Sequence, residues 1–123
     1  MKVLLVEDDP LDRANYEEFI KSARQNVEVI VAYDALDANA QLAKCIPQIA
    51  IIDMFLPVEV SGLELVKAMK AHPRTKDVRI FALSTSHSPE TADRARVAGC
   101  EDCFVKDRDV ERLIDVIKNA PYP

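Results

Sequence analysis

Five short apolar runs, separated by stretches with helical periodicity, are the feature of this sequence that most restricts its fold. The runs begin near residues 3, 27, 49, 78 and 103, at spacings of roughly 22 to 29 residues. Between them, apolar residues recur at helical intervals, most clearly at Val110, Leu113, Ile114 and Ile117. Such alternation predicts a parallel sheet covered by helices on both faces.

Residues that favour helix ends lie at the expected boundaries of these segments. An Asp or Ser followed by proline is a strong helix start, and glycine is a common helix stop. The predicted caps are Asp9-Pro10 for the first helix, Asp34 for the second, Ser88-Pro89 for the fourth, Asp107 or Asp109 for the fifth, and Gly99 at the end of the fourth.

The strand order follows from the second run. Residues 27–33 alternate more than the other runs, which indicates an edge strand, and they end in Tyr33-Asp34 alone. We therefore predict a doubly wound α/β fold, with a five-stranded parallel sheet in the flavodoxin-like order 2-1-3-4-5 and five helices. In such sheets ligands bind at the carboxyl edge, where strands 1 and 3 diverge.

Length and charge narrow the class of protein. A chain of 123 residues is expected to form one domain, residues 1–123, with no output domain. Met1, one residue before the first run, favours a natural start, and a domain excised from a longer protein is the alternative. The net charge of −5 argues against nucleic acid or anionic membrane as a partner. The first apolar run is too short for a signal peptide or a membrane span, which makes the cytoplasm the default compartment. Cys45, Cys100 and Cys103 are expected to be structural, because they form no disulfide or zinc pattern.

Polar residues follow four of the five runs. Three acids, Glu7-Asp8-Asp9, follow the first run, Asp53 the third, Ser84 the fourth and Lys106 the fifth. Acids gathered at one sheet edge would repel each other, and a hard divalent cation such as Mg²⁺ relieves this repulsion. With a hydroxyl and an ammonium beside them, these groups match what phosphoryl transfer requires: a nucleophile, a metal and positive charge.

The chain also resembles the receiver domain of bacterial two-component response regulators, of the stand-alone type, over residues 2–118. The resemblance is carried by LLVEDDP at 4–10, IIDMFLP at 51–57, ALSTS at 82–86 and FVKD at 104–107. It implies a signalling phosphoprotein rather than an enzyme, one that catalyses only its own phosphotransfer and dephosphorylation. The phosphoryl donor would be the phosphohistidine of a sensor histidine kinase or of a phosphotransfer protein in a phosphorelay.

The resemblance also implies roles for individual residues. Asp53 would accept the phosphoryl group, and Ser84 and Lys106 would contact its oxygens and operate the switch. Mg²⁺ (or Mn²⁺) would be held directly by Asp9 and Asp53 and by the backbone carbonyl of Phe55, with Asp8 acting through water. Output would be protein–protein contact, including a homodimer formed through helix 4, strand 5 and helix 5.

Two departures from the family pattern lie beside Lys106, and a third is one extra residue in the segment 58–62. Asp107 stands where the family usually has a proline with a cis bond. Cys103 stands where it usually has the switch aromatic, and Phe104, one position later, would point to the opposite face of a regular strand. These departures support an alternative, a degenerate receiver that acts as a phosphorylation-independent scaffold. The acids after the first strand argue against flavin binding, and Met54 and Phe55 argue against an aspartate-nucleophile phosphatase, which would have a second acid there.

Overall fold

A computed structural model gives the structure of residues 1–56 and 61–121, and each statement below concerns these residues. Strands and helices alternate along the chain without exception. The strands are β1 (Lys2–Val6), β2 (Glu28–Ala32), β3 (Ile49–Asp53), β4 (Arg79–Ser84) and β5 (Asp102–Val105). The helices are α1 (Pro10–Ala23), α2 (Ala35–Lys44), α3 (Gly62–Ala71), α4 (Pro89–Ala98) and α5 (Val110–Asn119).

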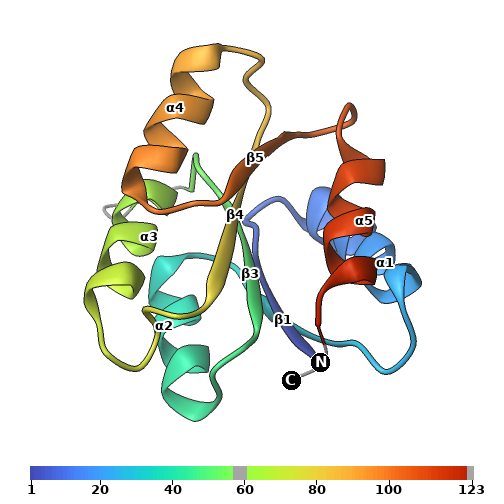
Figure 1. The fold of residues 1–123 in the computed structure, drawn as a ribbon, viewed down its shortest axis with the longest axis horizontal. Helices are drawn as coiled ribbons and strands as arrows, with labels where there is room; N and C mark the ends of the chain where they lie inside the picture. Colours follow the sequence, from blue (N-terminus) through green and yellow to red (C-terminus); the bar gives the residue numbers. More distant parts are fainter. Residues whose placement is uncertain (57–60, 122–123) are drawn as a thin grey trace.

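The sheet is parallel throughout, and its strand order is β2-β1-β3-β4-β5. This confirms the predicted fold class and places β2 at an edge. In the centre, Leu5 of β1 lies opposite Ile51 of β3, which in turn lies opposite Phe81 of β4. All the strands therefore point the same way, and their carboxyl ends meet at one edge of the sheet (Figure 1).

Helices cover both faces of the sheet. In Figure 1, α1 and α5 lie on one side, and α2, α3 and α4 lie on the other. Strand residues alternate between the two resulting cores: Leu4 and Val6 belong to the α2–α4 side, whereas Val3 and Leu5 belong to the α1–α5 side. All four are fully buried, as expected for strands covered on both faces. Each such side chain stabilises the fold by roughly 1.5–3 kcal/mol.

Most of the predicted helix caps are confirmed. The Oδ1 atom of Asp9 accepts hydrogen bonds from the first-turn amides of α1, and Asp34 and Ser88 cap α2 and α4. Gly99 ends α4 with φ 125°, a conformation that glycine adopts freely. Asp109 occupies the N-cap position of α5, but its carboxylate accepts a hydrogen bond from the Val105 amide, at 2.8 Å, and caps no helical amide.

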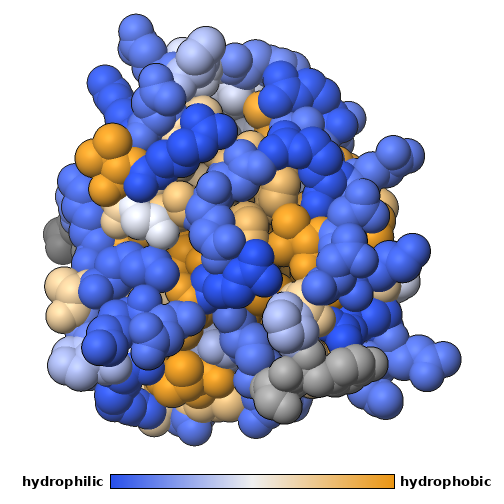
Figure 2. All heavy atoms as spheres, in the orientation of Figure 1, coloured by the Kyte–Doolittle hydropathy of each residue, from blue (hydrophilic) through white to orange (hydrophobic). Residues whose placement is uncertain are grey.

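The face of the molecule seen in Figure 2 is largely polar. Figure 2 shows hydrophilic residues over most of the visible face, with hydrophobic residues in small separate areas. No helix within residues 1–56 and 61–121 is long and apolar enough to cross a membrane. Most of the segment in which an extra residue was predicted, 58–62, lies outside the described residues.

Candidate functional site

Asp53, the last residue of β3, lies at the centre of the carboxyl edge. Only 4% of its surface is exposed. Its Oδ1 atom accepts a hydrogen bond from the Phe55 amide at 2.8 Å, and its Oδ2 atom accepts one from the Lys106 ammonium at 2.9 Å. A buried carboxylate requires partners of this kind, because it has lost its hydration. Each oxygen of Asp53 therefore has one fixed donor.

Gly62 allows the first turn of α3 to lie directly against the Asp53 peptide. A Cβ atom at position 62 would lie 2.0 Å from the carbonyl oxygen of Asp53 and 2.9 Å from Cα of Met54. These are backbone atoms in the middle of the molecule, so they cannot move aside cheaply. The absence of a side chain at Gly62 thus helps to fix the position of Asp53.

Lys106 brings a single buried ammonium to several carboxylates. Its side chain is 7% exposed, and Nζ lies 2.9 Å from Asp53, 3.0 Å from Asp12 and 2.5 Å from Oε1 of Glu7. Burial alone would lower the pKa of Lys106, but the carboxylates of Glu7, Asp53 and Asp12 outweigh burial and raise the pKa. Lys106 is therefore a permanent positive charge beside Asp53.

Glu7 is the first residue after β1, and its side chain is fully buried. Oε2 accepts a hydrogen bond from the Asp9 amide at 3.1 Å. Oε1 lies close to Lys106 but accepts no hydrogen bond of good geometry. Burial raises the pKa of Glu7 to about 7, although the Lys106 ammonium opposes the shift. An acid in this position favours an additional positive charge beside it.

Carboxylate oxygens from Glu7, Asp8 and Asp53 lie within 4.8 Å of one another and could hold a metal ion. These oxygens are the hard ligands that Mg²⁺ and Mn²⁺ prefer. Oε1 of Glu7 accepts no hydrogen bond of good geometry, although the Lys106 ammonium lies 2.5 Å away. The donor set therefore fits a divalent cation.

This set differs from the one expected from the sequence. Asp8 and Asp53 were predicted as metal residues, and the structure brings them together. It does not bring Asp9 into the group, because Oδ1 of Asp9 accepts hydrogen bonds from the Leu11 and Asp12 amides at 2.9 and 3.0 Å. Glu7 occupies the place expected for Asp9. Of Phe55, the structure shows the amide bound to Asp53, and the predicted role of its carbonyl stays a prediction.

Ser84 ends β4 at the same edge and is fully buried. Its Oγ atom accepts a hydrogen bond from the Ser86 amide at 2.9 Å. The hydroxyl of Ser86 in turn contacts the hydroxyl of Thr91 in α4 at 3.1 Å. A short polar chain thus connects the end of β4 to α4.

The strand beside Lys106 is regular. Cys103 pairs with Ala82 and Phe104 with Leu83, so no bulge changes the register. Phe104 therefore points to the α1–α5 side, where its ring stacks on Phe81 with centroids 5.5 Å apart. Cys103 points to the α2–α4 side. The expectation that Phe104 faces away from the usual position of the switch aromatic is confirmed.

Asp107, at the position where the family usually has proline, has a left-handed backbone with φ 67°. Its amide donates a hydrogen bond to the Tyr16 hydroxyl at 3.2 Å. Proline could do neither, since its ring fixes φ near −65° and it has no N–H. The turn after Lys106 is therefore built differently from a turn that contains proline.

The cysteines are free thiols, as expected. Cys100 and Cys103 are buried, and burial raises the pKa of both, that of Cys100 to about 12. Cys45 is partly exposed and lies 3.1 Å from Nζ of Lys2. None of the three lies in the carboxylate group at the carboxyl edge.

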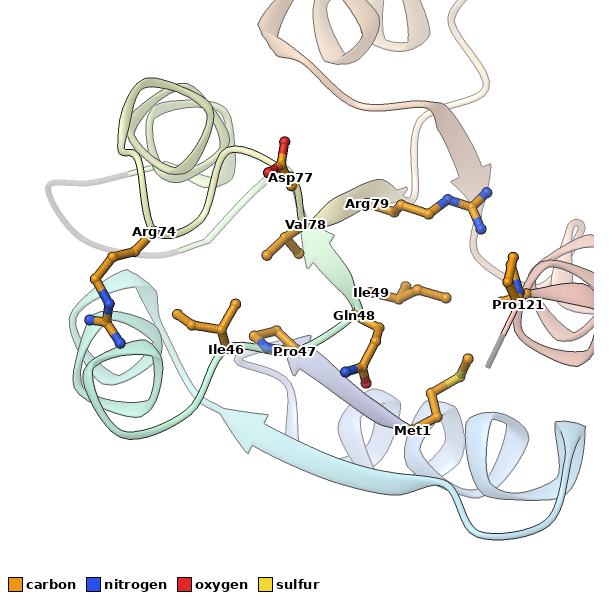
Figure 3. A pocket seen from close by; sticks show the side chains of 11 residues that line it. Met1, Ile46, Pro47, Gln48, Ile49, Arg74, Asp77, Val78, Arg79 and Pro121 are labelled. Carbon is orange, nitrogen blue, oxygen red and sulfur yellow. The ribbon is translucent and has the colours of Figure 1, made fainter. Parts of the chain in front are cut away.

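An apolar cavity of about 320 Å³ lies at the other end of the sheet, near the start of β3 and β4 (Figure 3). Met1, Ile49 and Pro121 contribute apolar surface to it. The guanidinium of Arg79 on its rim is paired with Glu101 at 2.7 Å. The cavity therefore lies apart from the charged groups of the carboxyl edge.

Two residues of this site, Asp12 and Gly62, were not predicted from the sequence. Glu7 was expected at this edge, but without a role in holding the metal. Glu7 continues the alternation of Val3 and Leu5, which face the α1–α5 core, so its inward direction could have been inferred. Asp12 lies in the first turn of α1, where an acid is ordinarily explained by the helix dipole. The close approach at Gly62 depends on tertiary packing, which no local pattern reveals.

Comparison with known proteins agrees with this architecture. The family model for the response regulator receiver domain matches residues 3–118. The polar-differentiation response regulator DivK of Brucella anthropi is 29% identical over 117 residues, which are 95% of this chain and 93% of DivK.

Solved structures agree as well. The chemotaxis protein CheY4 of Vibrio cholerae is 30% identical, with a TM-score of 0.83 and coverage of 95% of each chain. The Mn²⁺-bound form of response regulator Rcp1 is 23% identical, with a TM-score of 0.81 and coverage of 99% of this chain and 98% of Rcp1. At that identity Rcp1 supports the fold alone.

Proposed function

The chain belongs to the response regulator receiver domain family, and we propose that it is a phosphoacceptor switch in which Asp53 receives a phosphoryl group. The donor is the phosphohistidine of a sensor histidine kinase or a phosphotransfer protein. One observation carries this proposal: a buried ammonium, from Lys106, lies 2.9 Å from a buried carboxylate, Asp53, within a group of further acids. This supports phosphotransfer chemistry over the scaffold alternative, which needs none of these contacts.

In the proposed reaction a carboxylate oxygen of Asp53 attacks phosphorus. The new P–O bond forms as the P–N bond to the histidine imidazole breaks, and the imidazole leaves with the electron pair of that bond. The Phe55 amide holds the other carboxylate oxygen, which fixes the direction of attack. Lys106, already beside Asp53, balances the negative charge on the phosphoryl oxygens.

We infer that Glu7, Asp8 and Asp53 hold the divalent cation of this site. When bound, Mg²⁺ or Mn²⁺ neutralises the carboxylates and the phosphoryl oxygens. Asp9, bound to the first turn of α1, contributes by ordering the loop that carries Glu7 and Asp8.

Ser84 is the proposed sensor of the phosphoryl group. Its hydroxyl is bound to the Ser86 amide, and a shift toward the phosphate would release that bond and move the start of α4. The readout would be protein–protein contact, through a partner or a second copy at the face of α4, β5 and α5. The output does not depend on a switch aromatic at position 103, because Cys103 occupies it.

We expect Ser84→Ala to leave phosphorylation of Asp53 possible while weakening the response to it. Partner binding or dimerisation should be measured with and without phosphorylation, for example by sedimentation. Thr85→Ala, a neighbouring change of similar size on an exposed residue, is the control. An unaltered response in Ser84→Ala would remove Ser84 from this role.

Intact-mass measurement tests the proposed phosphotransfer. The protein is incubated with acetyl phosphate and Mg²⁺, and we expect one phosphoryl adduct on the wild type and none on Asp53→Asn. Omitting Mg²⁺ should greatly slow the labelling. Absence of an adduct on the wild type, under conditions that label other receivers, would support the scaffold alternative instead.

A further inference from the structure

Asp12 adds an anion that competes for the Lys106 ammonium. Its Oδ2 atom lies 3.0 Å from Nζ of Lys106, and the same nitrogen donates to Oδ2 of Asp53 at 2.9 Å. Because both oxygens contact one nitrogen, they lie within about 6 Å of each other, a distance at which unit charges interact appreciably. The Asp12 side chain is 36% exposed, whereas Asp53 and Lys106 are almost completely buried.

We propose that Asp12 is a positioning residue that acts through Lys106 and slows the phosphorylation of Asp53, an inference that rests on the function proposed above. In the resting state Asp12 holds one of the three N–H donors of Lys106. A phosphoryl group arriving at Asp53 must attract that ammonium away from Asp12 or share it. The carboxylate of Asp12 therefore lowers the rate at which Asp53 is phosphorylated.

The charge of Asp12 acts in the same direction as its hydrogen bond. Phosphorylation replaces the single negative charge of Asp53 with an acyl phosphate that carries nearly two. A further negative charge at about 6 Å disfavours this change. The factor is roughly three to ten at effective dielectric constants of about 80 to 40, the range suited to a carboxylate that is partly in water.

The Asp12 side chain contributes little to the stability of α1. The N-cap of α1 is Asp9, whose Oδ1 accepts the Leu11 and Asp12 amides. The Asp12 carboxylate contributes to the helix only through its favourable place in the first turn. Asp12→Asn should therefore fold normally, so its effect on phosphorylation can be read directly.

The test compares the rate of labelling by acetyl phosphate in Asp12→Asn and in the wild type. The P–O bond to acetate breaks as the bond to Asp53 forms, and acetate leaves with the electron pair. Glu18→Gln makes the same change of charge on an exposed residue of the same helix and serves as the control. Asp12→Glu, which restores the charge, is the conservative variant.

We expect Asp12→Asn to be labelled about three to ten times faster than the wild type, with Asp12→Glu and Glu18→Gln close to the wild type. The difference should shrink as salt is raised, because Asp12 is partly exposed and its field is screened. A rate for Asp12→Asn equal to or below that of the wild type would overturn the inference while leaving the proposed function intact. Failure of the wild type to label at all would overturn the proposed function instead.

Discussion

The roles of the three consecutive acids after β1 are decided residue by residue. The sequence shows that three acids follow β1, but it does not show which of them hold the metal and which one caps α1. Glu7 turns inward beneath Lys106, Asp8 lies at the mouth of the site, and Asp9 turns back to cap α1. The capping signal of Asp9 before Pro10 was recognised from the sequence, yet one carboxylate was expected to serve both as cap and as metal ligand. In the structure, Asp9 caps α1, and the buried carboxylate of Glu7 joins Asp8 and Asp53 in the group that could hold the metal.

The variants Glu7→Gln and Asp9→Ala test whether Glu7 binds the metal and Asp9 caps α1. We expect Glu7→Gln to weaken Mn²⁺ or Mg²⁺ binding about tenfold, equivalent to ~1.4 kcal/mol, because an anionic ligand is lost. Asp9→Ala should lower the free energy of unfolding by about 1 kcal/mol, the usual value of an N-cap, and change metal affinity much less. Calorimetric metal titration and urea unfolding measure the two effects. If Asp9→Ala abolished metal binding and Glu7→Gln did not, the roles would be reversed.

At the scale of elements, the sequence determined much more. Apolar runs, proline after the N-cap and Gly99 predicted the five strands and most helix boundaries, because each is a local signal. The strand order was predicted from the alternation of residues 27–33, which indicated an edge strand. The contact between α3 and β3 was not predictable, because it joins Gly62 to the Asp53 peptide through tertiary packing. Asp109 also differs from its prediction because of a tertiary contact. It lies at the N-cap position of α5, but its carboxylate accepts a hydrogen bond from the Val105 amide at the end of β5.

Gly62→Ala should disrupt the element that carries Asp53. We expect a loss of about 3 kcal/mol in the free energy of unfolding, because the new Cβ would meet immobile backbone. Gly99→Ala is the comparison variant: its Cβ would meet Cγ of Lys70, a side-chain atom that can shift more easily than backbone, and the unfavourable φ of 125° costs about 1–2 kcal/mol. Urea unfolding gives both values. Equal losses would show that the close contact between α3 and β3 does not make position 62 more sensitive to a side chain than position 99.

Asp109 should make the stability of the β5–α5 connection depend on pH. The Arg108 guanidinium and the Val105 amide hold the pKa of Asp109 at about 2, below its ordinary value of 3.8, although burial opposes the shift. The ionised form is thus favoured in the folded state, so its stabilisation is complete above pH 4 and is lost as the pH falls toward 2. Asp109→Asn should cost on the order of 1 kcal/mol at pH 7 and progressively less below pH 4. A difference that did not vary with pH would contradict this role.

At the scale of the whole molecule, the chemistry is concentrated at one edge of the sheet, while the thiols are distributed elsewhere. Cys45 is partly exposed at the end of α2, whereas Cys100 and Cys103 lie in the α2–α4 core. We expect iodoacetamide to label Cys45 readily in the native protein and the other two only after unfolding. Mass spectrometry at increasing urea would follow this order. Rapid native labelling of Cys103 would show that the core near β5 opens locally.

The proposed phosphoacceptor function requires that Asp53 is the residue that carries the phosphoryl group. Borohydride reduces an acyl phosphate to an alcohol and releases phosphate, which converts phosphorylated aspartate to homoserine. Peptide mass spectrometry after treatment with acetyl phosphate, Mg²⁺ and borohydride then locates the modified residue. We predict homoserine at position 53 and unmodified Asp8, Asp9 and Asp12. Homoserine at any of those three positions, with Asp53 unchanged, would contradict the assignment of Asp53 as the phosphoacceptor.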